Sequence, residues 1–348
     1  MNLLNIKLLC FLDFYECVFG TKLNSTRRLS VEERLFPRNL IHSEKLSTEF
    51  RVKIAENILS NFEPLNFQIL PDVEIRVVAS DRGGSYLLQT VAFLIEQQIP
   101  GNFNLSICNV ENRKFKEIER FENISMTIYQ ANSGLEKSSE LNTTLFKENQ
   151  DYWKCLGFPT TSRYILLIED DSLIISEFSN LLKSLVYRLD LSDHVDFVKM
   201  YHPSKLRKLP AWFFYISSAF IISCSTCLFI NWSFPSFTVI LLTLLLSHNL
   251  TGYGSQFPAE FRYRLTGSAY FSFPESCCTP AVIFRTSSQP EMVKYFGETN
   301  AYGGHAKDHI LDESPFIGRQ SDLNYVTHIG AMSSIRHRPV ILSELFEN

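Results

Sequence analysis

The sequence predicts an α/β fold with a mostly parallel sheet, interrupted by a two-helix hairpin of the membrane-spanning type. Three observations support this prediction. Strand-like and helix-like segments alternate from Val73 onward, the apolar run Ile165–Ile168 indicates a strand buried on both faces, and residues 209–259 contain no Asp, Glu, Lys or Arg. These 51 charge-free residues suffice for two helices, because each bilayer crossing needs about 20 residues.

The composition fits a globular body that carries such an insert. The chain has 348 residues, of which 45% are hydrophobic and 20% are charged, enough for one large domain or two small ones. Its 33 basic and 37 acidic residues give a formal net charge of -4, and they form no long basic block. Proteins that bind nucleic acid present strongly basic surfaces, so no nucleic-acid partner is expected.

The first 71 residues precede the predicted sheet. Residues 1–20 are a candidate signal anchor, because Leu3–Phe19 is largely apolar, although three charged residues interrupt it. A charge near the centre of a membrane helix costs about 2.5 to 3.5 kcal/mol on insertion scales, which weakens this prediction. We predict a stem over residues 21–71. It contains an amphipathic helical pattern made by Phe50, Ile54, Ile58 and Phe62.

The segment after the stem predicts a βαβ unit. Val73–Ala79 and Phe103–Cys108 have the composition of strands, and Tyr86–Gln97 between them has helical periodicity. This order gives parallel strands, and parallel sheets bind ligands beyond the carboxyl ends of their strands. The loop after the first strand is therefore a candidate nucleotide contact, although a plain glycine turn is the alternative. Its candidate binding residues are Ser80, Asp81 and Arg82.

Three acidic residues, Glu169, Asp170 and Asp171, directly follow the buried strand. They must meet water or a cation, because the burial of unpaired charge is costly. A hard divalent ion such as Mn²⁺ or Mg²⁺ takes oxygen ligands from carboxylates and from substrate phosphates together. We therefore predict a metal site here. A solvated acidic turn or a helix N-terminus, where acids are also favoured, is the alternative.

The charge-free run predicts a hairpin of two membrane helices. Ala211–Ile230 fills one crossing, and Trp232 to about Thr251 fills a second. A buried core hairpin of a soluble protein is the alternative. The insert divides the globular part of the chain. The predicted boundaries are residues 72–208 for its first part, 209–258 for the hairpin and 259–348 for its second part.

Two segments in the second part carry candidate catalytic residues. Asn324–Ile329 is a predicted strand that ends near His328, whose neutral imidazole could complete the coordination of an ion held by Asp171. A single histidine at a strand end is otherwise structural. Upstream, a predicted helix offers carboxylates at Asp312 and Glu313 for general-base catalysis, and their spacing leaves open which one serves.

The sequence gives conflicting indications of which side of the membrane holds the globular part. Basic residues flank the hairpin on both sides, which favours the cytosol by the positive-inside rule. Four Asn-x-Ser/Thr triplets outside the hairpin favour a glycosylated luminal domain, although such triplets also arise by chance. They begin at Asn24, Asn104, Asn123 and Asn142. We expect the lumen.

Four of the eight cysteines lie outside membrane-like segments, namely Cys108, Cys155, Cys277 and Cys278. The vicinal pair is poorly placed to bond with itself. One of its members is therefore expected to reach Cys155 or Cys108 in an oxidising compartment. Four free buried thiols are the alternative.

The order of these features resembles one known family. The apolar strand with its three acids, the hairpin, the segment Ser276–Ala281 and the segment His328–Ser334 look like the GPI-specific N-acetylgalactosamine transferases, the post-GPI-attachment factor four family. The resemblance covers about Val73 to Arg336. It implies a GT-A glycosyltransferase domain with an inserted transmembrane hairpin, in a multi-pass Golgi enzyme with a luminal catalytic domain. The implied donor is UDP-GalNAc, and the implied acceptor is a mannose of the glycan on GPI-anchored proteins, which stand on membrane lipid. Transfer would proceed with inversion.

The resemblance also implies roles for single residues. Asp171 and His328 would ligate Mn²⁺ or Mg²⁺, Glu169 or Asp170 would lie near the donor ribose, and we expect Asp308 to be the base. Family members have a clear first membrane anchor, whereas the present N-terminal segment is charged. Two other functions stay open. One is another UDP-sugar-dependent Golgi transferase, such as one that adds N-acetylglucosamine to N-glycans, and the other is a non-catalytic membrane-anchored module that binds glycan or lipid.

Overall fold

The computed structural model describes most of the predicted sheet and hairpin. The described residues are 44–62, 71–98, 101–124, 126–131, 134–135, 140–175, 177–203, 211–230, 235–251, 259, 262–263, 269–272, 274 and 278–330. The predicted signal anchor, the sequon at Asn24, Cys277 and the turn after Gly330 lie outside the described residues.

The first part of the sheet follows the predicted alternation. β1 (Val73–Ala79) has the predicted bounds, and α4 (Tyr86–Glu96) and β2 (Phe103–Asn109) match theirs to within one residue. The elements that follow are α5 (Lys116–Glu122), β3 (Thr127–Gln130), α6 (Leu141–Gly157), β4 (Tyr164–Glu169) and β5 (Ser172–Ile174). The predicted βαβ unit is confirmed, because β1 and β2 pair in parallel.

The later elements complete the sheet on either side of the hairpin. They are α7 (Phe178–Asp190), β6 (Phe197–Lys199), α8 (Ala211–Ile230), α9 (Pro235–Thr251), β7 (Phe271–Ser272), β8 (Ala281–Arg285), α11 (Gln289–Glu298), α12 (Lys307–Asp312), β9 (Gly318–Ser321) and β10 (Val326–His328). A helix within the predicted stem, α3 (Glu44–Ser60), packs against α4. Their contact includes a buried hydrogen bond of 2.6 Å from Arg51 Nε to Gln89 Oε1.

The main sheet has eight strands in the order β3-β2-β1-β4-β8-β6-β9-β7 among the described residues. Neighbours from β3 to β4 pair in parallel, and so do β6 and β9. β8 lies antiparallel between β4 and β6, and β7 is antiparallel to β9. The sheet is therefore mostly parallel, and the carboxyl ends of β1 and β4 meet at one edge because these two strands are neighbours.

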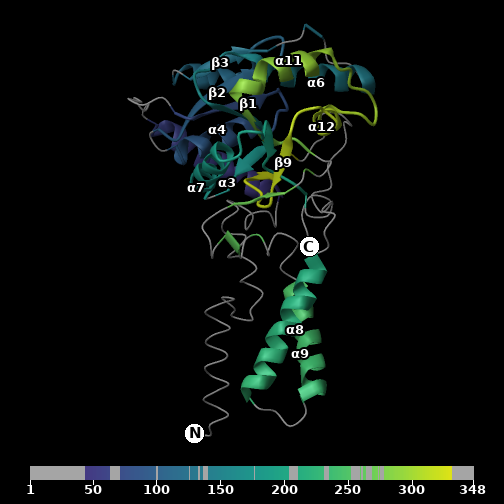
Figure 1. Ribbon diagram of the computed structural model, residues 1–348. Coiled ribbons are helices and arrows are strands. Elements are labelled where there is room, and N and C mark those ends of the chain that lie inside the picture. Colours follow the sequence, from purple (N-terminus) through teal and green to yellow (C-terminus); the bar gives the residue numbers. More distant parts are fainter. Residues whose placement is uncertain are drawn as a thin grey trace.

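The sheet is covered on both faces (Figure 1), which explains the continuous apolar run of β4. Leu166 and Ile168 belong to one buried cluster with residues of α4 and α7, whereas Ile165 and Leu167 belong to another with residues of α6 and α11. Alternate side chains of a strand point to opposite faces, so an apolar residue is needed at each position. The prediction of a strand buried on both faces is confirmed.

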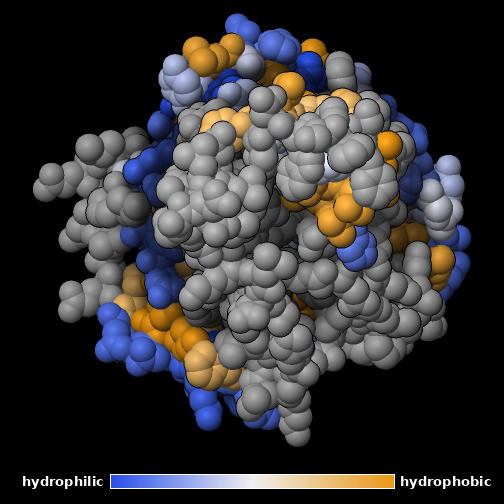
Figure 2. Space-filling model, turned by 90° about the horizontal axis from the view of Figure 1, so that it is seen from below, coloured by the Kyte–Doolittle hydropathy of each residue, from blue (hydrophilic) through white to orange (hydrophobic). Residues whose placement is uncertain are grey.

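Two helices, α8 and α9, project together below the sheet as a hairpin (Figure 1). They pack against each other, and buried residues of α8 recur every four positions. These residues are Tyr215, Ala219, Ser223 and Cys227. Large apolar side chains elsewhere on the pair are exposed, including Leu228 at 82% and Leu244 at 63%. Figure 2, viewed from below, shows such hydrophobic areas at the surface.

The hairpin has the predicted position, and α8 has the predicted bounds. Within the part of the chain that the structure describes, no helix reaches the length and apolarity that a bilayer crossing requires. The membrane crossing stays a prediction.

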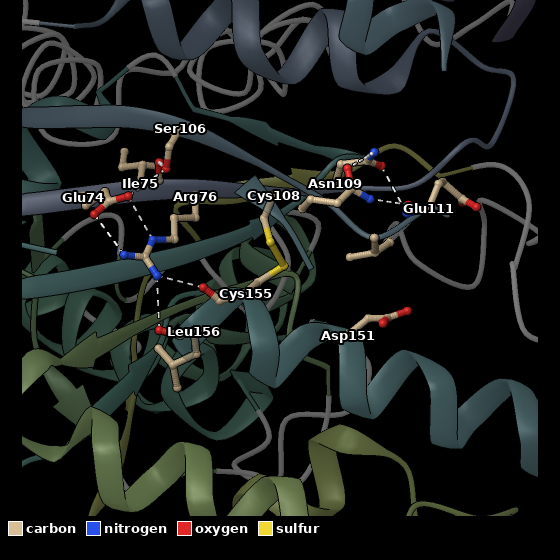
Figure 3. Close-up of a disulfide and its surroundings, with 12 residues drawn as sticks. Glu74, Ile75, Arg76, Ser106, Cys108, Asn109, Glu111, Asp151, Cys155 and Leu156 are labelled. Atoms are coloured by element: carbon tan, nitrogen blue, oxygen red, sulfur yellow. Dashed lines mark hydrogen bonds and ion pairs between the residues drawn. A yellow bond between two sulfur atoms is a disulfide. The ribbon is translucent and has the colours of Figure 1, made fainter. Parts of the chain in front are cut away.

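A disulfide joins β2 to α6, between Cys108 and Cys155 (Figure 3). The expectation that one of the vicinal cysteines reaches either of these was wrong. The sheet places β2 beside β1, against which α6 packs, so the two sulfurs meet without the vicinal pair. Cys278 is itself disulfide-bonded, which also rules out four free thiols.

Arg76 holds the end of α6 beside the Cys108–Cys155 bond, because it donates to the carbonyl oxygens of Cys155 at 2.8 Å and Leu156 at 3.1 Å.

Candidate active site

The three acids lie where β4 leaves the sheet. Glu169 is the last residue of β4, and its N–H donates to Pro280 O at 2.9 Å, while Asp170 N–H donates to Val78 O at 3.1 Å. These backbone bonds to both neighbouring segments fix the turn between β4 and β5. Asp170 and Asp171 are buried at 1% and 0% exposure, so the alternative of a solvated acidic turn is wrong for these two residues.

A second, two-stranded sheet brings His328 to Asp171. β10 pairs antiparallel with β5, so that His328 lies opposite Ser172, and Ile329 N–H donates to Asp171 O at 2.8 Å. As a result His328 Nε2 lies 3.3 Å from Asp171 Oδ2. The structure thus brings these two distant residues together, and their role as ligands of one ion stays a prediction.

The arrangement fits a divalent ion. One ligand atom from each of Glu169, Asp171 and His328 lies within 4.8 Å of the other two. Asp171 Oδ1 and His328 Nδ1 are buried and have no hydrogen-bond partner among the described residues. Two carboxylates and an imidazole are ligands suited to Mn²⁺ or Mg²⁺, and an unsatisfied buried carboxylate oxygen is costly without a cation. The predicted metal ligands Asp171 and His328 are thus brought together, and Glu169 joins them.

Gly330 keeps this space open. A Cβ atom at this position would lie 2.2 Å from Asp171 Oδ2 and 3.0 Å from His328 Cε1. Contacts under 3.0 Å force atoms to move, so only glycine allows the backbone to pass this close to the two side chains. The glycine of the predicted small-residue turn therefore has a steric reason to be there.

Two basic side chains contact the acids. Arg82 Nη1 donates to Asp171 Oδ2 and its Nε lies 3.3 Å from Asp170 Oδ1. Lys307 Nζ lies 2.8 Å from Glu169 Oε1, and it also pairs with Glu148. When all four carboxyl groups of this cluster are ionised, they exceed the two cations by two negative charges. That is the charge that a divalent ion would neutralise.

Burial and the neighbouring charges shift the pKa values of Glu169 and Asp170 in opposite directions. Burial alone would raise the pKa of Glu169, but attraction to Lys307 and Arg82 lowers it to about 2. Burial raises the pKa of Asp170 to about 7, against the attraction of Arg82. The two carboxyl groups differ because Glu169 contacts Lys307 directly, whereas burial dominates at Asp170.

The loop after β1 is tied to Asp170. Ser80 N–H donates to Asp170 Oδ2 at 2.9 Å, and Arg82 Nε donates to Ser80 Oγ at 2.9 Å. Thr90 Oγ1, on α4, donates to Asp170 O at 2.6 Å. Asp81 is exposed, and its N–H donates to Glu111 Oε1 at 2.9 Å. The predicted nucleotide loop thus lies at the acidic site, and Asp170 shapes it. Contact of Ser80, Asp81, Arg82 or Asp170 with a nucleotide stays a prediction.

The two predicted bases occupy different environments on α12. Asp308 is in the first turn, directly after Lys307, and its carboxylate accepts bonds from Cys278 N–H at 3.3 Å and His309 N–H at 3.0 Å. Asp312 forms an ion pair with the fully buried Lys199. Burial raises the pKa of Asp312 and lowers that of Lys199, as expected for a pair removed from water. Neither aspartate belongs to the metal-type cluster.

Sequence reasoning gave no role to Lys307 or to α6. The Lys307 ammonium lies 4.9 Å from the centroid of the Tyr152 ring, and both Tyr152 and Glu148 are on α6. A lysine two residues after a histidine in a polar turn has no signature of its own. Its partner acids come from β4 and α6, so only the packing of these elements reveals the contact.

The fold and the site together define the class of the protein. A cluster suited to a divalent ion, beside the loop that follows β1 of a mostly parallel sheet, matches an enzyme that handles a phosphorylated donor. Comparison with known families identifies this enzyme as a glycosyltransferase. The model of the family "GPI-N-acetylgalactosamine transferase PGAP4" matches residues 73–328, and the chain belongs to this family.

One solved structure similar to the chain is the mannosyltransferase PcManGT from Pyrobaculum calidifontis in complex with GDP-Man and Mn²⁺. The identity is 11% and the TM-score is 0.27. The match covers 48% of this chain and 46% of that chain, so the chain spans about half the length of this structure.

Proposed function

We propose that this chain is a metal-dependent, inverting transferase of the GT-A type that moves N-acetylgalactosamine from UDP-GalNAc to a mannose of the GPI glycan. The single observation that carries the proposal is the meeting of Glu169, Asp171 and His328 at the carboxyl edge of the sheet. Membership of the GPI-N-acetylgalactosamine transferase family supports the choice of donor and acceptor.

Glu169, Asp171 and His328 would hold the Mn²⁺ or Mg²⁺ ion. When bound, the ion would neutralise the charge that develops on the UDP leaving group. Lys307 keeps Glu169 ionised, because it contacts this carboxylate directly and lowers its pKa. Ser80 and Arg82 line the same edge, where a diphosphate would need donors.

Asp308 is the stronger of the two candidate bases. An inverting transfer needs a carboxylate that takes the proton of the attacking hydroxyl. Asp308 immediately follows Lys307, which contacts Glu169, and its side chain is 23% exposed, so it is open to an acceptor. Asp312 is paired with buried Lys199 and is better explained as part of the support for α12.

We propose that the hairpin anchors the enzyme in the Golgi membrane with its catalytic part in the lumen. The exposed apolar side chains of α8 and α9 would lie in lipid, which removes the cost of exposing them to water. Small buried residues between the two helices suit helix packing in a bilayer. The Cys108–Cys155 disulfide supports an oxidising compartment. A site fixed at the membrane surface would face the glycan of a lipid-anchored acceptor.

The test is a transfer assay with the full-length protein in detergent or liposomes, with UDP-GalNAc and UDP-GlcNAc offered separately to a GPI-glycan acceptor. We expect Mn²⁺-dependent transfer from UDP-GalNAc and its loss in Asp171→Asn. Transfer from UDP-GlcNAc in preference to UDP-GalNAc, or activity only when an N-glycan acceptor replaces the GPI glycan, would support the rival transferase. Unchanged Mn²⁺-dependent UDP binding in Asp171→Asn would refute the proposed site.

A second experiment addresses the hairpin. Residues 209–258 are replaced by a soluble linker, and hydrolysis of UDP-GalNAc is compared with transfer to acceptors embedded in liposomes. We expect hydrolysis to persist and transfer to fall, because the insert would position the site and none of its described residues belongs to the Glu169, Asp171 and His328 cluster. Equal loss of both activities would contradict a positioning role.

A further inference from the structure

Arg82 holds the carboxylate that the ion would need. Its guanidinium donates to Asp171 Oδ2, and the same oxygen lies 3.3 Å from His328 Nε2. Its Nε reaches both Asp170 Oδ1, at 3.3 Å, and Ser80 Oγ, at 2.9 Å. The side chain is 20% exposed, whereas those of Asp170 and Asp171 are 1% exposed. A partly exposed cation thus covers two buried acids.

This position conflicts with a divalent ion beside the same carboxylate. Two cations a few ångströms apart repel each other strongly where water is largely excluded. Either the ion takes the oxygen that Arg82 holds, or it uses the unpartnered Asp171 Oδ1 and still meets the guanidinium charge. In both cases the presence of Arg82 weakens the binding of the ion.

Arg82 is the more exposed of the two cations at the site, since its side chain is 20% exposed and that of Lys307 is 12% exposed. Gly83 follows it directly with a φ of +69°, and Gly84 comes next. By contrast, Lys307 is held between Glu148 and Glu169 and lies against the Tyr152 ring. Of these two cations, Arg82 is therefore the one more open to an incoming donor.

We propose that Arg82 is a placeholder for the divalent ion: it neutralises Asp170 and Asp171 while the site is empty, and it is released to the phosphates of the donor once the ion is bound. The inference rests on the proposed metal-dependent function. It makes ion and donor binding mutually supportive, because the donor gains a free guanidinium only in the ion-bound protein.

The experiment measures Mn²⁺ affinity by paramagnetic resonance of the free ion, with the full-length protein and no nucleotide. Arg82→Gln removes the competing charge, and Arg82→Lys retains it. The matched control is Arg163→Gln, because Arg163 also bridges two aspartates, Asp72 and Asp190, but at 52% exposure and away from the acidic site.

We expect Arg82→Gln to bind Mn²⁺ about tenfold or more tightly than the wild type, because one unit charge is removed near the ion. Arg82→Lys and Arg163→Gln should stay within about threefold of the wild type. Unchanged or weaker Mn²⁺ binding by Arg82→Gln overturns the proposal. If the wild type binds no Mn²⁺, the proposed metal-dependent function fails as well. If the wild type binds Mn²⁺ but Arg82→Gln binds it no more tightly, only the proposed role of Arg82 fails.

Two further readouts apply to the same variants. Mn²⁺ should raise the melting temperature of Arg82→Gln more than that of the wild type, since the ion then takes over the neutralisation that Arg82 gave to two buried acids. UDP should tighten Mn²⁺ binding in the wild type more than in Arg82→Gln. Equal effects of UDP in both proteins would refute the release of Arg82 to the donor.

Discussion

Replacing Gly330 by alanine tests the geometry of the metal site with a single added carbon. The new Cβ atom would lie 2.2 Å from Asp171 Oδ2 and 3.0 Å from both Asp171 Cγ and His328 Cε1. Ordinary contact begins at 3.4 Å, so the carbon and the oxygen must separate by about 1.2 Å. Asp171 cannot yield freely, because it is buried, its carboxylate contacts Arg82 and His328, and its carbonyl accepts the N–H of Ile329.

A displacement of this size is large for metal coordination. Ligand distances in metal sites are held to about 0.2 Å, and a misplacement of about 1 Å in an active site can lower the rate about 100-fold. We therefore expect Gly330→Ala to weaken Mn²⁺ binding and to lower kcat/KM for transfer, each by about 100-fold. The cost in unfolding free energy without metal should be only about 1 to 3 kcal/mol, as for other overpacked sites.

Mn²⁺ affinity, transfer rate and melting temperature in EDTA are measured on the same preparation. Gly297→Ala is the matched control, because its Cβ would have no atom within 4 Å and should change none of the three. Wild-type Mn²⁺ affinity in a folded Gly330→Ala protein would refute the assignment of Asp171 and His328 as ligands of one ion.

Three other predictions concern the supports of the site and the sheet. Burial alone would raise the pKa of Glu74, but hydrogen bonds from Arg76 lower it below the ordinary value of 4.5. The ionised Glu74 therefore stabilises the fold above pH 4.5, and this contribution is lost as the pH falls further. Glu74→Gln should therefore lose about 3 to 5 kcal/mol at pH 7 in denaturant unfolding, with a smaller difference below pH 4.5, and an equal loss at both values would contradict this account. Lys307→Met should lower kcat at least about tenfold, and it should raise the pKa of Glu169 because it removes the neighbouring positive charge. The pKa change is measured as a shift in the pH dependence of Mn²⁺ binding, and an unshifted pH profile would count against the contact between Lys307 and Glu169. Cys155→Ser should lower the unfolding free energy by about 4 kcal/mol, the entropy of a loop of 47 residues. Reductant, which also breaks the bond of Cys278, should remove the difference between the wild type and the variant.

Local patterns in the sequence were sufficient to predict the elements that carry the site. A strand buried on both faces needs an apolar residue at every position, and Tyr164 to Ile168 meets this need in sequence as in structure. The acids that follow it stand at the carboxyl end of a parallel strand, where α/β sheets bind ligands. Helix α8 was predicted to the residue, because an uninterrupted apolar run has few alternatives.

Contacts between distant segments could not be predicted in the same way. The register of β10 on β5 places His328 against Asp171, and a shift by one residue would turn the imidazole to the other face. Pairing of Cys108 with Cys155 follows from the packing of α6 on the sheet, which cysteine spacing does not encode. Arg82 was predicted to meet a nucleotide, yet in the structure it contacts the acids.

The sequence by itself determined which residues carry charge, because charge depends on side-chain chemistry. It also determined which segments must be buried, because burial follows the periodicity of apolar residues along the chain. Tertiary structure alone decided which charges meet. Glu169 contacts Lys307, and Asp171 contacts Arg82 and His328, only because sheet order and helix packing bring separate segments to one edge of the sheet. Electrostatic attraction falls with distance in space and not with separation along the chain, so these pairs have no signature in local sequence.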